Sequence, residues 1–132
     1  MNTVTSLVAS AFIVCALTTA CGSSTETSSG AKNPSVTECS AQAKPASDKV
    51  RAVIDANRAC KTDDDCESVG VSSACFDQCT SAIAKSGRAA VEQALTDVGT
   101  NECKAFADAG CKVVIPPCAP PSPPACRDSK CT

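Results

Sequence analysis

The cysteines restrict the fold of this chain more than any other feature. Twelve of its 132 residues are cysteine, about 9%, the level at which a short chain is typically held together by disulfide bonds. Disulfides persist in oxidising compartments outside the cytosol. We therefore expect an exported protein with one small domain, and the composition argues against a cytosolic enzyme.

Ten cysteines lie between positions 39 and 131, and we expect five disulfides whose pairing the sequence leaves open. The spacing Cys-x-x-Cys and histidine are both absent from the chain, so the usual zinc, haem and thioredoxin-like patterns are missing. Cys75 and Cys79 would share a helix face, which suits a metal or, as we favour, disulfides to two different partners. We predict no metal and no cofactor. The ten are Cys39, Cys60, Cys66, Cys75, Cys79, Cys103, Cys111, Cys118, Cys126 and Cys131.

Residues 1–20 have the features of a signal peptide. They contain no charged side chain, and positions 7–17 are apolar apart from Ser10. This run is too short to cross a bilayer, which takes about 20 apolar residues. We therefore expect the leader to be removed on export, and we expect no transmembrane helix.

The leader ends in LTTAC at positions 17–21, which resembles the lipobox of bacterial lipoproteins. The resemblance implies diacylation of Cys21 and anchoring to a membrane. The alternative is ordinary signal peptidase cleavage after Ala20, which would leave Cys21 as a plain thiol in a periplasmic or secreted protein. Acylation is favoured because it leaves ten cysteines, an even number, for pairing. The residue after Cys21 is Gly22 and not Asp. By resemblance to lipoprotein sorting in enterobacteria, this favours the outer membrane.

Residues 21–38 are predicted to be the lipidated cysteine followed by a flexible tether. Ser, Thr and Gly dominate this stretch, and its few apolar residues show no periodicity, as in flexible linkers. The tether would hold the domain away from the membrane. Residues 39–132 are then the disulfide-stapled domain.

Residues 47–59 are predicted to form an amphipathic helix that ends at Cys60. Apolar side chains recur there on one face, and Ser47 and Asp48 are candidates for the N-terminal cap. The apolar residues of this face are Val50, Val53 and Ile54.

A second helix is predicted over residues 81–98, where apolar residues also keep helical spacing. Gly99 follows at the position typical of a C-terminal cap glycine. Residues 101–109 form either a third, short helix or an irregular loop before Gly110.

Strand patterns are shorter and lie elsewhere. Residues 67–72 alternate apolar and polar side chains, and residues 111–115 contain a β-branched run. Residues 126–131 enclose a tight turn between two cysteines. We predict a small disulfide-rich α+β fold, with two or three helices packed on a short antiparallel sheet. An all-helical disulfide-rich arrangement is the alternative.

An acidic loop, CKTDDDC, connects Cys60 and Cys66. It resembles the Cys-x-x-Asp-x-Asp-Cys segment of whey-acidic-protein domains, which implies protease inhibition or antimicrobial action. Its carboxylates suit calcium, which takes several oxygen ligands. We favour a solvated turn in which an aspartate caps the backbone. The carboxylates are those of Asp63, Asp64, Asp65 and Glu67.

The span from residue 39 to residue 131 is similar to cysteine-rich lipoproteins of myxobacteria. The shared features are an early Cys-x-x-Asp-x-Asp-Cys segment, a helix after it and a closing cysteine hairpin. This resemblance implies a location in the cell envelope and no established activity.

Proline fills much of residues 116–124, which read PPCAPPSPP. Such a segment favours a stiff polyproline II or bent extended conformation, which loses little entropy on binding. We predict a candidate binding loop for a protease cleft or an aromatic-lined groove on a partner. The alternative is a rigid spacer between Cys118 and Cys126. Its prolines are Pro116, Pro117, Pro120, Pro121, Pro123 and Pro124.

The residue types that are missing restrict the function. Without histidine, Ser-His and Cys-His catalysis are excluded, and a net charge of −2 gives no nucleic-acid signature. We expect a non-enzymatic cell-envelope lipoprotein, anchored to a membrane through its lipid, that acts as a structural module or binds a protein partner. A secreted or surface protease inhibitor is the alternative. The oligomeric state stays open.

Overall fold

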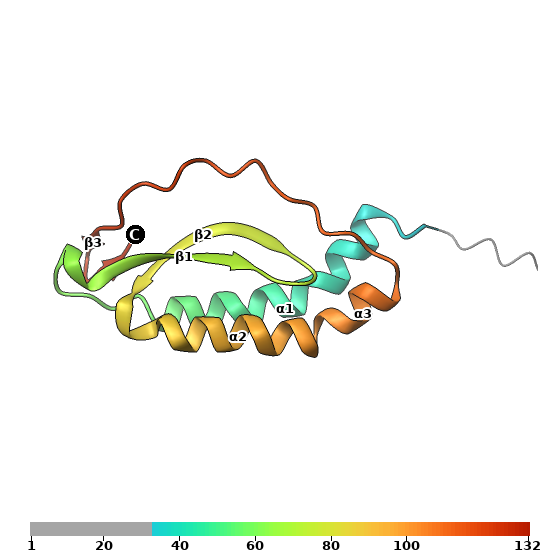
Figure 1. The fold of residues 1–132 in the computed structure, drawn as a ribbon, viewed down its shortest axis with the longest axis horizontal. Helices are drawn as coiled ribbons and strands as arrows, with labels where there is room; N and C mark the ends of the chain where they lie inside the picture. The colour runs from blue at the N-terminus through green and yellow to red at the C-terminus, as the bar shows by residue number, and fades with distance from the viewer. Residues whose placement is uncertain (1–32) are drawn as a thin grey trace, which may run out of the picture. The chain divides into compact units, whose positions relative to one another are not determined.

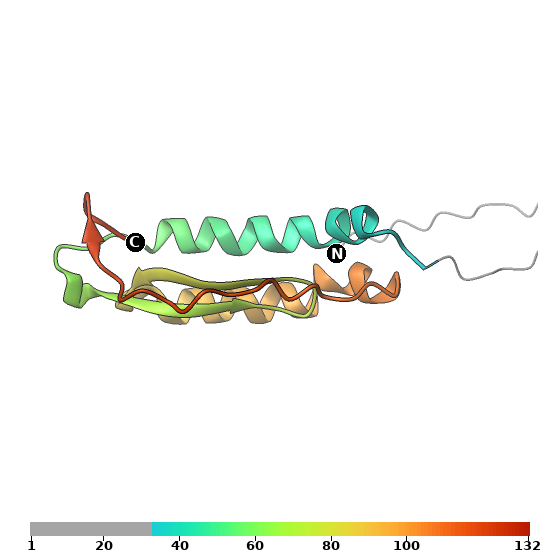
Figure 2. The same cartoon turned by 90° about the horizontal axis from the view of Figure 1, so that it is seen from above.

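Two helices lie side by side, and a β-hairpin covers one face of the pair (Figures 1 and 2). The computed structural model describes residues 33–132. The predicted signal peptide, the lipidation at Cys21 and most of the predicted tether lie outside the described residues. In chain order the elements are α1 (Val36–Ala56), η1 (Asp63–Asp65), β1 (Cys66–Ser72), β2 (Asp77–Ala84), η2 (Lys85–Gly87), α2 (Arg88–Thr100), α3 (Cys103–Asp108), β3 (Cys126–Arg127) and β4 (Lys130–Cys131).

The small α+β class is confirmed, and the all-helical alternative is wrong. Within residues 33–132, three α-helices accompany two separate antiparallel sheets of two strands each. The longer sheet is the β1–β2 hairpin, in which Ile83 pairs with Glu67 and Val69 pairs with Ser81. The shorter sheet, β3–β4, closes the C-terminus.

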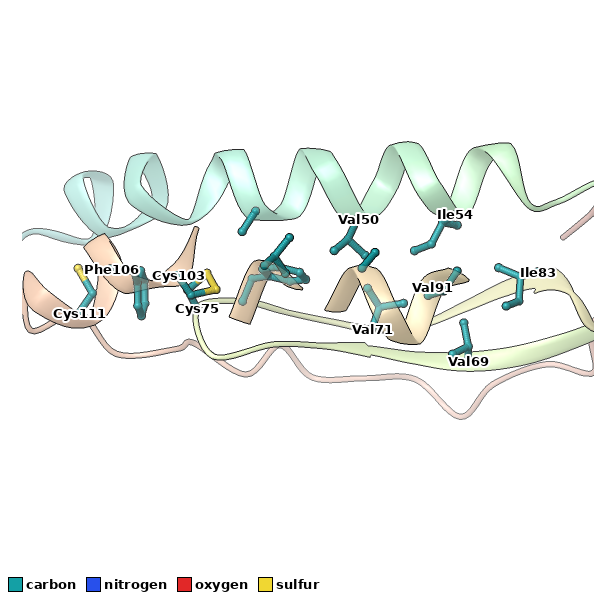
Figure 3. Packing of buried hydrophobic residues seen from close by; sticks show 14 residues of the cluster. Val50, Ile54, Val69, Val71, Cys75, Ile83, Val91, Cys103, Phe106 and Cys111 are labelled. Carbon is teal, nitrogen blue, oxygen red and sulfur yellow. A yellow bond between two sulfur atoms is a disulfide. The ribbon is translucent and has the colours of Figure 1, made fainter. Parts of the chain in front are cut away.

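The core lies between the helices and the β1–β2 hairpin (Figure 3). Val50 and Ile54 project from α1, while Val71 and Ile83 project from the hairpin. Burying these apolar side chains supplies the main favourable term in folding. At the other end of the core, Phe106 of α3 lies beside a disulfide that joins α3 to the turn between β1 and β2.

The first helix begins earlier than the pattern indicates. Ser35 is its N-cap, and the Ser35 and Glu38 side chains each bond the other's backbone N–H, which forms a capping box. The prediction of a start at Ser47 or Asp48 is wrong, because Pro45 lies inside the helix and does not precede it. The helix also takes in residues 36–38, which the sequence assigns to the tether.

Pro45 lies inside α1, where a proline changes the course of a helix. A proline within a helix removes one backbone hydrogen bond and crowds the preceding turn, which bends the helix. Figure 1 shows the N-terminal turns of α1 inclined to the rest of the helix.

The predicted helix over residues 81–98 is wrong in its first part. Residues 81–84 belong to β2, and α2 begins only at Arg88. Gly87 ends the intervening turn, where a side chain would overlap Asn57, so the close approach of two segments decides this boundary. Gly99 lies inside α2, and Asn101 is the C-cap.

The short helix predicted before Gly110 is confirmed as α3, and Gly110 has a φ of +74°, a conformation that glycine adopts without strain. The strand predicted over residues 67–72 is confirmed as part of β1. The strand predicted over residues 111–115 is wrong, because that segment pairs with no strand among the described residues.

The predicted tight turn in residues 126–131 is confirmed. Asp128 and Ser129 have φ values of 50° and 61°, the backbone conformation of a two-residue hairpin turn. The turn is fastened to the loop after α1, since the backbone N–H groups of Cys60 and Cys131 bond the carbonyls of Ser129 and Arg58.

All ten cysteines of the domain are paired, which confirms the expected five disulfides. The pairs place this domain in an oxidising, extracytoplasmic setting. Cys75 and Cys79 pair with different partners, as favoured, but they do not share a helix face, because Cys79 lies in β2. No described helix has both the length and the apolarity to cross a membrane. The pairs are Cys39–Cys111, Cys60–Cys126, Cys66–Cys131, Cys75–Cys103 and Cys79–Cys118.

A pair of isoleucine substitutions tests the core. Ile83 is 0% exposed, and Ile83→Ala should lower the free energy of unfolding by about 2–5 kcal/mol through lost burial and a cavity. Ile115 is 74% exposed, and Ile115→Ala should change the free energy by less than about 0.5 kcal/mol. Urea unfolding with the disulfides intact measures both, and equal unfolding midpoints would contradict this core.

Candidate binding surface

The segment that joins α3 to β3, residues 112–125, is called the arch below. It passes along the outer side of the β1–β2 hairpin (Figures 1 and 2). Disulfides hold it at both ends and near its middle: Cys111 is bonded to α1, Cys118 to β2 and Cys126 to Cys60. The arch is therefore a cross-linked part of the domain despite its lack of regular structure.

The backbone of the arch has unused hydrogen-bonding groups. Residues 112–124 form no hydrogen bond between backbone groups with any described residue. The first such bond along the arch is at Ala125, which pairs with Thr132. Most residues of the arch are exposed. Six prolines fix φ at their positions and lower the entropy of the segment. This arrangement suits both the predicted binding loop and the alternative of a rigid spacer.

Two apolar side chains stand out at the start of the arch. Val114 and Ile115 are 73% and 74% exposed, whereas Val113 packs against the core. Large aliphatic side chains gain free energy when they leave water. Contact with another molecule would bury both of them.

A groove of about 750 Å³ opens beside the start of the arch. One wall is a stripe on α1, formed by every third or fourth residue from Val36 to Arg51. The groove is also lined by Phe76 in the turn between β1 and β2, by Phe106 of α3, and by Val114 in the chain that leaves α3. The sequence predicts no such groove, because the stripe becomes visible only when Pro45 is placed inside the helix.

The charged residues at the groove differ in their pairing. Lys44 and Asp48 form an ion pair with each other, and Asp77 accepts a hydrogen bond from the backbone of Cys79 at 2.8 Å. Arg51 and Lys112 are exposed. Neither one has an ion-pair partner within residues 33–132. The groove thus has two cationic groups available for an anion.

The acidic loop uses its carboxylates to hold the backbone. Asp65 accepts hydrogen bonds from the backbone N–H groups of Lys61 and Thr62 at 2.8 and 2.9 Å. These bonds lower the pKa of Asp65 below its ordinary value of 3.8, because they favour the charged form. Asp63 accepts a bond of 2.7 Å from the backbone of Cys126. The favoured interpretation, an aspartate-capped turn, is confirmed.

Glu67, the fourth carboxylate considered for calcium, faces α2. Its two oxygens accept hydrogen bonds of 2.9 and 2.7 Å from the Arg88 guanidinium, a bidentate geometry that arginine favours with carboxylates. Arg88 thereby lowers the pKa of Glu67. This pair joins β1 to α2, so Glu67 serves the packing of the hairpin on the helix.

Sulfur atoms gather at two places in the described part of the chain. Cys60, Cys66 and Cys131 have sulfur atoms within 4.8 Å of one another, and Asp77, Cys79 and Cys118 form a similar group. Every one of these cysteines is in a disulfide. A cysteine binds a metal as its thiolate, so these cysteines offer no ligand of that kind while the disulfides are intact.

Comparisons with family models, with curated proteins and with solved structures found no match. The similarity to whey-acidic-protein domains and to myxobacterial lipoproteins remains an expectation from the sequence. The candidate site therefore depends on the geometry of the arch and the groove.

Substitutions in the acidic loop test its structural role. The folded state depresses the pKa of Asp65, so its stabilisation should be present above about pH 4 and disappear as the pH falls through the lower folded-state pKa. Asp65→Asn should lower stability at pH 7 and remove this part of the acid dependence. Thermal unfolding across this pH range measures the effect.

Asp64 provides the matched control, since it lies in the same turn and its side chain bonds to no described residue. Asp64→Asn should leave the pH profile close to that of the unsubstituted chain. Identical profiles for the two variants would contradict the capping role of Asp65.

Proposed function

We propose that this protein is a non-enzymatic, membrane-anchored lipoprotein of the cell envelope that binds a partner protein through the arch. The observation that carries the proposal is the state of the arch, whose exposed backbone has no hydrogen bonds over residues 112–124 within the described structure. Disulfides to α1, β2 and the loop after α1 fix its course.

The physical basis is strand addition. An extended segment with unpaired N–H and C=O groups adds to the edge of a partner's sheet, or lies in a partner's cleft, through main-chain hydrogen bonds. Binding usually costs the entropy of ordering such a segment. Here disulfides and prolines have already restricted the arch, so the cost at binding is lower. Proline has no N–H, so the N–H groups available for such pairing lie mainly in residues 112–115, before the first proline.

The pairing of the cysteines supports the lipid anchor. The ten described cysteines pair with one another, which leaves no partner among them for Cys21. A lipobox-like segment precedes Cys21, and acyl chains on a cysteine give stable membrane attachment when two or more are present. The anchored form would display the arch at the outer membrane or the cell surface.

A second candidate function is protease inhibition. The observation that favours it is the stretch between Cys111 and Cys118, where Val114 and Ile115 are 73% and 74% exposed in a segment that is neither helix nor strand. Proteases bind substrates and inhibitors in extended form, with side chains in pockets beside the cleft. A protease with an aliphatic pocket would be the partner in this case.

The anchor is tested by the intact mass of the protein from its native host, before and after reduction and alkylation. We expect a lipid-sized increment and ten cysteines that are alkylated only after reduction. Cys21→Ser should abolish the increment and release the protein from membranes. Cys15→Ser, in the predicted leader, should leave the mature mass unchanged. An unacylated native protein would contradict the anchor.

The arch is tested by photo-crosslinking in the native host. A benzophenone amino acid at Ser122 of the arch should give a discrete protein adduct, which excess unlabelled domain should compete away. The same amino acid at Thr96, exposed on α2, is the control and should not give this adduct. A protease in the adduct would favour the second candidate. The same products from both positions, or none from Ser122, would contradict binding through the arch.

A further inference from the structure

We propose that the groove along α1 binds a long-chain carboxylate, with Arg51 bound to the carboxylate and the alkyl chain directed toward Val36 and Val114. This goes beyond the proposed function, because it concerns a small molecule and does not depend on the partner of the arch. Three features of the groove support the inference, each by a separate argument: its shape, its lining and its charge.

The shape suits an extended ligand. The volume of about 750 Å³ falls within the range of small-molecule sites, roughly 300–1,000 Å³. The α1 wall runs from Val36 to Arg51, about 22 Å at 1.5 Å per residue. A molecule that fills such a groove is long and narrow.

The lining suits an alkyl chain. The groove is lined by Phe76, Phe106 and the Cys39–Cys111 disulfide, among other residues. Val36 and Val114 stand at its rim with 74% and 73% of their surface exposed, and an alkyl chain beside them would remove apolar surface from water. A peptide fits less well, since the backbone groups of the α1 wall are mostly bonded within the helix.

The charged residues of the groove indicate the sign of the ligand's charge and the orientation of the ligand in the groove. Lys44 and Asp48 pair with each other, whereas Arg51 forms no ion pair within residues 33–132. A guanidinium binds a carboxylate through two parallel hydrogen bonds. Lys112 lies at the other end of the groove, because its neighbour Cys111 is bonded to Cys39. Cys39 is twelve residues before Arg51, or about 18 Å along the helix. The exposed valines are at this second end, so the alkyl chain lies there.

The test is calorimetric titration of the whole exported chain, carrying Cys21→Ser so that no acyl chain of its own competes. Dodecanoate below its micellar concentration should bind with a stoichiometry of one. Arg51→Gln should weaken binding by roughly tenfold, because two parallel charged hydrogen bonds from an exposed guanidinium are lost. Arg127→Gln is the matched control at the far β3–β4 turn and should not change the affinity.

A second pair of variants tests the alkyl end. Val114→Glu should weaken binding by about tenfold, through lost apolar contact and the cost of placing a charge beside the alkyl chain. Ile115→Glu places the same charge on the next residue, which does not line the groove, and should have little effect. Both side chains are exposed, so neither substitution disturbs the core, and unfolding temperatures verify this.

Other ligands and one more variant fix the chemistry and the direction. Dodecanol and dodecylammonium should bind at least about tenfold more weakly than dodecanoate, since neither offers a carboxylate to Arg51. Lys112→Gln should weaken binding less than about threefold, as an exposed charge does. The proposal is overturned by no saturable binding of dodecanoate, by equal affinity for dodecylammonium, or by a larger loss from Lys112→Gln than from Arg51→Gln.

Discussion

The three disulfides that hold the arch are the constraint on which the rest of the structure depends. They join residues 72, 66 and 39 positions apart. A cross-link over loops of this length, taken alone, raises the free energy of unfolding by about 4 kcal/mol in the chain-entropy model. No backbone hydrogen bond with a described residue fixes the course of residues 112–124. The cross-links therefore give this segment its position over a small core.

The same cross-links create both candidate surfaces. Cys39–Cys111 brings the start of the arch to α1 and lines the groove, while Cys79–Cys118 holds the middle of the arch to β2. The proposed protein contact uses the exposed backbone of residues 112–124. The proposed carboxylate site uses the space beside α1. Reduction of the disulfides would remove both surfaces, which agrees with an oxidising location.

The sequence predicts an element correctly where a single local pattern determines it. The alternation in residues 67–72 and the cysteine-flanked turn at residues 126–131 both appear as predicted. It fails in two places for different reasons. The Ser35–Glu38 capping box is a local Ser-x-x-Glu signal that lies before the predicted start of the helix, so Pro45 falls inside α1. Gly87 ends a turn because a distant residue, Asn57, packs against it. The disulfide pairing and the groove depend on such distant contacts throughout, so no local pattern predicts them.

Disulfide mapping of the native protein tests the central claim most directly. Cleavage after lysine and arginine and before Asp77 separates the cysteines onto different peptides, apart from two pairs, Cys66 with Cys75 and Cys118 with Cys126. Fragmentation of each shared peptide resolves these pairs. The account predicts Cys118 bonded to Cys79, and Cys111 bonded to Cys39. A bond between Cys111 and Cys118 would release the arch from α1 and β2, and it would contradict both proposed surfaces.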